Sequence, residues 1–303
     1  MKKWIQNFGL LAATAIFFAV GGSAAAAGDL VGYWNFDEAT GTNAADASGN
    51  ANHGTFVGSG ATHSTVLPPT SCFINTHSVQ FDGSGDHVEI ADNATMDPTN
   101  AISISFWMNP DSVNNGYQHV LFKQGPVVTS YGVWLANDHV YMESNDNSIR
   151  SLTSNATVTA GDWHYITVTY DGTEQKLYID GTLDNSQSLS GITLTYTNSP
   201  VKIGTGDYNN PFAGYVDDLR IYNRALTAGE IADLAAGGCG PGVVSNIVSP
   251  TSTGGSGATT AGASTATAAN TLVDSGMSVA LTTGLAAFII IAASAIATRR
   301  KPD

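Results

Sequence analysis

The sequence predicts an all-β protein, an antiparallel two-sheet sandwich that ends in one short helix. Charged residues make up only 12% of the chain and glycine occurs 33 times, a composition typical of short strands joined by tight turns. Between residues 29 and 238, apolar and polar residues alternate in short segments, as expected of strands with one face in the core. Only the segment 227–236 has the pattern of a helix.

The alternation places the expected strands along the chain. They cover residues 32–36, 78–82, 87–90, 102–108, 131–135, 163–170, 175–179 and 214–222. Asp171-Gly172 and Asp180-Gly181 supply turns between neighbouring strands, and the sequence GSGD at 83–86 is expected to close a hairpin. Phe106, Trp107 and Trp163 are expected in the core.

The helix has recognisable start and stop signals. Thr227 is a plausible N-cap, Glu230 stands three residues later as in a capping box, and Gly237 ends the segment. Many strands followed by one helix indicate a sandwich or a jelly roll.

Several ordered motifs resemble the laminin-G-like jelly roll of the concanavalin A-like lectin/glucanase superfamily. They are YWNFDE at 33–38, SGNANHG at 48–54, GDWHYITVTYDG at 161–172, KLYIDG at 176–181, VKIG at 201–204 and FAGYVDDLRIYNRAL at 212–226. Together they span nearly the whole region 28–238, which we expect to be the folded domain. The resemblance implies two antiparallel sheets packed face to face, with the first and last strands as neighbours.

Both ends of the chain resemble targeting sequence. Residues 1–27 combine two lysines, an apolar stretch and small residues, as in a secretory signal peptide, with an uncleaved N-terminal anchor as the alternative. Residues 278–298 are apolar and long enough to span a bilayer, and the basic tail 299–303 would stay in the cytoplasm. The intervening residues 239–277, rich in Gly, Ser, Thr and Ala, are expected to form a disordered stalk. The protein is therefore predicted to be exported and anchored at the cell surface.

A sorting-like motif precedes the apolar segment. Leu272, Ser275 and Gly276 resemble the signal that sortase-type transpeptidases cut to attach proteins to cell walls. Val273 stands where that signal has proline, and Ser275 where it has threonine. Wall attachment and a retained membrane anchor therefore both stay open.

The two cysteines, Cys72 and Cys239, match one disulfide bond. An exported domain favours a bridge over free thiols. Such a bridge would tie the end of the domain to its body.

A structural Ca²⁺ site is expected around Asp46 and Asn50. Their loop offers oxygen ligands, which calcium prefers. The resemblance would bring Asp217 or Asp218 near this loop, and relatives often hold calcium in a comparable role. The alternative is a local turn at Asp46 with a salt bridge from Asp218 to Arg220 or Arg224.

Aromatic side chains on loops or strand ends are the candidates for ligand binding, because their faces stack on sugar rings. The candidates are Tyr117, Tyr131, Trp134, Tyr141, Tyr208 and Phe212. Loops expected at 109–118, 123–130 and 204–213 would form the surface around them.

Function is predicted to be recognition of a glycan or a surface protein in cell adhesion, without catalysis. The net charge of −14 repels phosphate backbones and argues against nucleic-acid partners. No strand carries the closely spaced pair of carboxylates that a retaining glycoside hydrolase needs. An architectural surface protein without a ligand and a hydrolase of unfamiliar geometry are the alternatives.

Overall fold

A computed structural model describes residues 29–241, except 73, 115, 126–128, 146–147, 190–192 and 207–209. The predicted signal peptide, the membrane segment, nearly all of the stalk and the basic tail lie outside the described residues. So do Tyr208 and the sorting-like residues Leu272, Ser275 and Gly276. No helix in the described part of the chain is long and apolar enough to cross a membrane.

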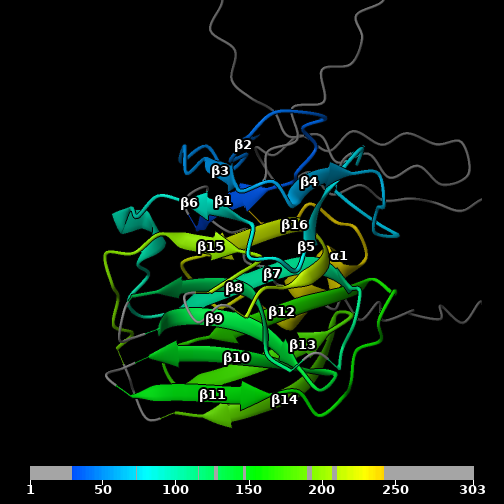
Figure 1. Cartoon of the computed structure of the whole chain (residues 1–303). Helices are drawn as coiled ribbons and strands as arrows, with labels where there is room; N and C mark the ends of the chain where they lie inside the picture. Colours follow the sequence, from blue (N-terminus) through cyan, green and yellow to red (C-terminus); the bar gives the residue numbers. More distant parts are fainter. Residues whose placement is uncertain are drawn as a thin grey trace, which may run out of the picture. The chain divides into compact units, whose positions relative to one another are not determined.

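Two antiparallel sheets of eight strands each form the domain (Figure 1). In spatial order, the first sheet contains β14 (Thr182–Ser188), β13 (Glu174–Ile179), β12 (His164–Tyr170), β7 (Ile102–Pro110), β16 (Ala213–Tyr222), β5 (Ser78–Asp82) and β4 (Ala61–Ser64), with β1 (Leu30–Trp34) also paired to β16. The second contains β11 (Ile149–Thr153), β10 (His139–Asn145), β9 (Thr129–Ala136), β8 (Gln118–Gln124), β15 (Val201–Ile203), β6 (His87–Ile90), β3 (Gly54–Val57) and β2 (Asn43–Ala44). A 3-10 helix, η1 (Ala94–Met96), and the α-helix α1 (Ala228–Ala235) complete the structure.

The main core lies between the sheets, and alternate residues of each strand fill it. Phe106 of β7 and Ile166 of β12 are paired neighbours within it. Their chain neighbours Trp107 and Tyr165 point to the other face of the first sheet, where a second cluster includes Ile231 of α1. The helix therefore covers the outer face of the first sheet, and the predicted burial of Phe106 and Trp107 is confirmed.

The turn predicted at residues 83–86 connects the two sheets instead of two paired strands. Residues 83–86 do not close a hairpin, because β5 before them belongs to the first sheet and β6 after them to the second. Gly83 and Gly85 both have positive φ angles, 78° and 103°, which lets the backbone change direction between the sheets. Alternation identified both strands but carries no information on which sheet each joins. The Asp180-Gly181 turn does close a hairpin, with Ile179 paired to Thr182.

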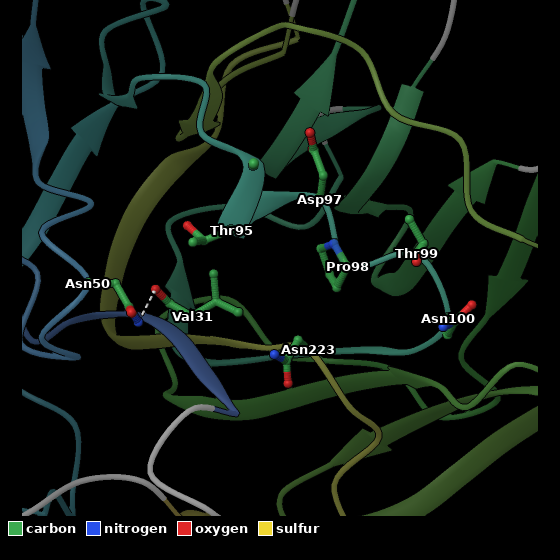
Figure 2. Close-up of a pocket in the computed structure, with 9 residues that line it drawn as sticks. Val31, Asn50, Thr95, Asp97, Pro98, Thr99, Asn100 and Asn223 are labelled. Atoms are coloured by element: carbon green, nitrogen blue, oxygen red, sulfur yellow. Dashed lines mark hydrogen bonds between the residues drawn. The ribbon is translucent and has the colours of Figure 1, made fainter.

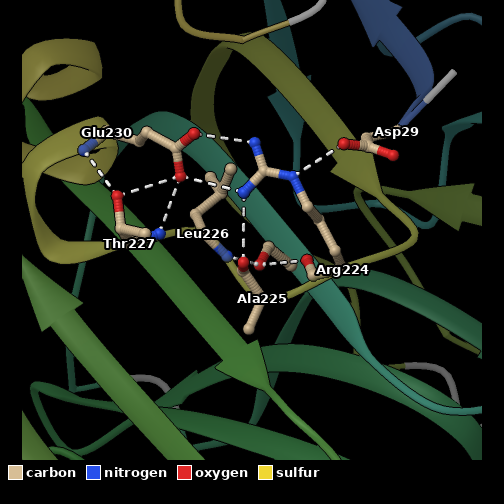
Figure 3. A network of polar contacts seen from close by, with 7 residues as sticks. Asp29, Arg224, Ala225, Leu226, Thr227 and Glu230 are labelled. Carbon is tan, nitrogen blue, oxygen red and sulfur yellow. Dashed lines mark hydrogen bonds and ion pairs between the residues drawn. The ribbon is translucent and has the colours of Figure 1, made fainter. Parts of the chain in front are cut away.

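The helix joins the two ends of the domain (Figure 3). Thr227 and Glu230 form the predicted capping box at its start. Glu230 also accepts two hydrogen bonds from Arg224, at 2.9 and 2.7 Å, and Arg224 donates a third to Asp29 at 3.0 Å. This cluster ties the segment before β1 to the segment after β16, and it complements the pairing of these two strands.

The predicted disulfide bond is present between Cys72 and Cys239, whose Cα atoms lie 4.4 Å apart. It links the segment between β4 and β5 to the residues after α1. Thr70 supports the same contact, because its hydroxyl donates to the carbonyl of Ala235 at 3.3 Å. A bridge of this kind fits an oxidising compartment.

Candidate functional site

The candidate site lies on the outer face of the second sheet, where aromatic side chains gather. Val133 and Met142 point into the core, so Trp134 of β9 and Tyr141 of β10 point outward. These two residues are paired across the strands, and their rings stack 3.8 Å apart at 7°. Tyr117, which is 60% exposed, lies with its ring 5.0 Å from Trp134. We call these three rings the aromatic platform.

A β-bulge in β8 places two further rings, both buried, beside the platform. The register of β8 against β9 shifts between His119 and Leu121, so that Val120 and Leu121 both point into the core. His119 and Phe122 therefore point outward together, with rings 4.1 Å apart. A Cβ on Gly132 would lie 2.6 Å from the Phe122 ring, so only glycine leaves room for that ring.

A cavity of about 210 Å³ opens between these side chains. Its lining combines aromatic, apolar and polar residues, namely Tyr117, His119, Phe122, Gln124, Thr129, Trp134, Glu143, Ile149 and Asn210. Desolvation raises the pKa of Glu143, and a hydrogen bond with Thr129 lowers it in part. Ile149 is 63% exposed at the edge of the cavity. The exposed Tyr117 ring and the half-buried Trp134 ring beside one carboxylate suit a ligand ring that has an apolar face and hydroxyl groups at its edge.

The platform agrees only in part with the sequence-based candidates. Tyr117, Trp134 and Tyr141 come together at the site. Tyr131 and Phe212 were expected there, but both are 0% exposed, because each points into the core. Glu143, Phe122 and Ile149 were missed, since β10, β8 and β11, which carry them, were not predicted as strands.

The four predicted calcium ligands do not converge on one site. The Asp46 carboxylate accepts hydrogen bonds from the backbone of Tyr33, Ser48 and Asn52 and from the Ser48 hydroxyl, at 2.8–2.9 Å. Asn50 uses its amide to donate to the carbonyls of Leu30 and Val31. These residues organise the loop, as in the alternative considered for Asp46, and do not fit a shared cation site with β16.

Asp217 and Asp218 are engaged elsewhere, where the register of β16 against β7 shifts between Asp217 and Arg220. Asp218 has a φ of 51° and accepts hydrogen bonds from the Tyr33 hydroxyl at 2.6 Å and from Arg220 at 3.4 Å. Asp217 accepts one from Asn75 at 2.6 Å. Within the described residues, no group of three or more His, Cys, Asp or Glu side chains is placed to hold a metal ion. Calcium binding stays a prediction without a converged ligand set.

The buried Asp217 leads to a prediction about pH. Burial raises its pKa well above the ordinary value, and the charge of Asp218 raises it further. The folded state therefore holds this proton more tightly than the unfolded chain, and Asp217 makes the free energy of unfolding decrease as pH rises from about 4. Asp217→Asn should remove this contribution. The variant's stability relative to wild type should rise with pH, by up to about 1.4 kcal/mol per pH unit, in denaturation curves recorded between pH 4 and 8.

Asp171→Asn is the matched control for this experiment. Burial by itself would raise the pKa of Asp171, but hydrogen bonds from Thr173 and Glu174 lower it overall. This carboxylate stabilises the fold above its unfolded pKa, and that stability is lost as pH falls. Its replacement should give no pH trend between pH 4 and 8, and a difference of the opposite sign when the curves are extended below about pH 4. Parallel pH profiles for Asp217→Asn and wild type would contradict the assignment.

A second cavity, of about 420 Å³, lies near the start of β1 (Figure 2). Asn50 and Val31 border it on one side, and Asp97, Thr99 and Asn100 on the other. It is larger than the cavity beside the platform, but its lining contains no aromatic ring. A ligand that contains a ring binds best where it can stack on an aromatic side chain. The cavity beside the platform is therefore the better candidate of the two for such a ligand.

Residues 82–232 match the family model for the concanavalin A-like lectin/glucanases superfamily. The domain is a concanavalin A-like jelly roll. Comparison with curated protein sequences gave no match. Several solved structures share the fold of this chain at low sequence identity, and they include binding domains of toxins and one domain of an arabinanase.

The binding domain of Paraclostridial Mosquitocidal Protein 1 superposes with a TM-score of 0.56 and 19% identity, over 69% of this chain and 52% of that one. Domain 4 of AbnA, a GH43 extracellular arabinanase from Geobacillus stearothermophilus solved with arabinotriose, gives 0.54 and 20%, over 68% of this chain and 98% of the domain. The binding domain of botulinum neurotoxin DC, solved with rat synaptotagmin II, gives 0.53 and 13%, over 69% and 51%. This chain spans about half the length of the two toxin binding domains.

Proposed function

We propose that this concanavalin A-like domain is a non-catalytic recognition module that binds glycans outside the cell. The observation that carries the proposal is the aromatic platform on the outer face of the second sheet. Trp134 and Tyr141 present stacked rings, and Tyr117 stands 60% exposed beside them. A partly exposed aromatic surface on a sheet can receive a sugar ring with little loss of side-chain entropy on binding, because stacking already holds two of its rings in place.

The polar groups at the site would fix the orientation of a bound sugar through hydrogen bonds. Glu143 offers carboxylate oxygens to sugar hydroxyl groups, and Gln124 and Asn210 offer amides from two neighbouring segments. The arabinotriose complex of AbnA domain 4 supports a sugar as the ligand class on this fold. The synaptotagmin complex of the neurotoxin domain keeps a surface protein as the second candidate.

Glu143 is the one acidic side chain among the described residues that line this cavity. A retaining glycoside hydrolase needs two carboxyl groups about 5–5.5 Å apart. The platform therefore supports binding over hydrolysis.

Export and surface anchoring belong to the same proposal, since the disulfide bond fits an extracellular location.

Trp134→Ala should abolish or weaken glycan binding by at least about tenfold, because a buried aromatic contact commonly contributes more than 1.4 kcal/mol to affinity. The measurement is a glycan array, followed by calorimetry on each sugar that binds. Leu183→Ala is the matched control, since Leu183 is 50% exposed but lies on β14 of the other sheet. Equal affinity of Trp134→Ala and wild type for the same sugar would contradict the assignment of the platform as the binding site.

A further inference from the structure

Lys123 is a buried lysine held between two aspartates. It lies on β8 opposite Tyr131 of β9 and Val201 of β15, both core residues, and its side chain is 0% exposed. Its Nζ contacts the Asp92 carboxylate, lies 3.1 Å from Oδ1 of Asp97 and donates to the carbonyl of Ser199 at 2.9 Å. Buried ammonium groups are rare because desolvation opposes the charge.

Aromatic side chains close this site on the core side. Tyr131 is fully buried and donates to the carbonyl of Met96 at 3.2 Å, and Tyr196 packs edge-on against it at 6.1 Å. Burial raises the pKa of Asp97, although Lys123 lowers it in part, and the Asp92 charge raises it further. Asp97 therefore keeps a proton more readily than an ordinary aspartate.

We propose that Lys123 and Asp92 condense into an intramolecular amide bond, with Asp97 as the acid that promotes the reaction. The Lys123 amine is the nucleophile and the Asp92 carboxyl carbon is the electrophile. The fold already holds the two groups in contact, so the reaction needs no encounter step. The domain would thus carry a covalent cross-link in addition to its disulfide bond.

The reaction balances without any further reagent. The Lys123 ammonium first transfers one proton to the Asp92 carboxylate, which gives a neutral amine and a carboxylic acid. Nζ then attacks Cγ of Asp92 while Asp97 hydrogen-bonds to the developing oxyanion. One N–C bond forms, one C–O bond breaks, and the oxygen leaves with two protons as one water molecule. Asp97 also lines the 420 Å³ cavity, which offers this water a way out.

The cross-link has a structural rationale within the second sheet. Asp92 follows the end of β6, and β15 lies between β6 and β8. The amide would join β6 to β8 across β15 and hold these three interior strands of the second sheet together. It would also replace the charge of the fully buried Lys123 by a neutral amide, which lowers the desolvation cost.

Trypsin provides the test, because it cuts after a lysine only when the amine is free. The purified full chain is denatured, reduced and digested, and the peptides are analysed by mass spectrometry. We expect no cleavage after Lys123. Because Asp92 and Lys123 lie in one tryptic peptide, the product should be a continuous peptide that ends at Arg150 and is lighter than its sequence mass by one water. Lys176 is the internal control, since it forms a 2.8 Å ion pair with Glu174 but is partly exposed, and cleavage after it should be complete. Full cleavage after Lys123 in wild type would show a simple ion pair and overturn the proposal.

Two variants assign the roles. Asp97→Asn keeps Lys123 and Asp92 but removes the acid, and it should give a folded protein that trypsin cuts after Lys123. Asp92→Ala should also be cut there, because the electrophile is gone. Near-ultraviolet circular dichroism checks that both variants are folded. An uncut peptide lighter by one water in Asp92→Ala would overturn the assignment of the partner, and one in Asp97→Asn would overturn the role of Asp97.

Discussion

Arg220→Leu is expected to lower the free energy of unfolding by about 3–5 kcal/mol, because it leaves a buried carboxylate without its cation. Arg220 is 1% exposed and Asp218 is 3% exposed. The guanidinium donates to the backbone carbonyl and the carboxylate of Asp218 and lies 4.1 Å above the Tyr33 ring. The Tyr33 hydroxyl would remain as a donor to Asp218, but it carries no charge. Denaturant unfolding monitored by tryptophan fluorescence measures the change.

A double variant separates loss of the ion pair from loss of packing. Asp218→Asn removes the stranded charge, and asparagine tolerates the positive φ that this position requires. Arg220→Leu combined with Asp218→Asn should therefore recover part of the stability lost in Arg220→Leu alone. A single variant within about 0.5 kcal/mol of wild type would contradict a stabilising role for the pair.

Replacing both Cys72 and Cys239 with serine is expected to lower the free energy of unfolding by about 2–5 kcal/mol. The bridge closes a separation of 167 residues, and loops of this length lose much conformational entropy when they are closed in the unfolded chain. The change should appear as a lower midpoint in denaturant unfolding under oxidising conditions.

Reduction of the wild type is the control for this variant. The reduced wild type should match the variant, and reductant should leave the variant unchanged. Hydrogen exchange should show the largest loss of protection in α1, because Cys239 follows it and Thr70 contacts its last residue. Equal stability with and without the bridge would contradict the prediction.

Features that depend on local chemistry could be predicted from the sequence. The capping box of Thr227 and Glu230, the Asp180-Gly181 hairpin and the disulfide bond each follow from residue types and spacing, and the structure contains all three. The two-sheet sandwich follows from alternation of apolar and polar residues, because strands with one buried face must pack in layers.

The site was harder to predict because it depends on departures from alternation. The bulge in β8 places His119 and Phe122 on one face although three positions separate them, whereas strict alternation places them on opposite faces. Alternation also cannot distinguish an aromatic residue that points into the core from one that points outward. Tyr131 and Trp134, on the same strand, were therefore treated alike, and only Trp134 reaches the platform.

The calcium prediction depends on the partners of buried carboxylates, which residue type alone does not identify. Asp46, Asp217 and Asp218 were read as ligands because carboxylates in loops and buried strands need partners. The structure gives them backbone amides, Asn75, Tyr33 and Arg220 as partners. Residue type alone cannot say whether a partner is a metal or a protein donor, since both satisfy a carboxylate.

The central claim is that ligands bind on the aromatic platform, and the indole N–H signals of tryptophan test it most directly. A sugar selected on the array is titrated into ¹⁵N-labelled protein, and substitutions to phenylalanine assign each indole signal. The Trp134 signal is predicted to shift progressively and saturate. The Trp34 signal should stay in place, because that ring is fully buried and its Nε1 donates to the carbonyl of Asn52 at 3.0 Å. Saturable binding that leaves the Trp134 signal unmoved, while residues such as Asn50 and Asn100 around the second cavity respond, would contradict the claim.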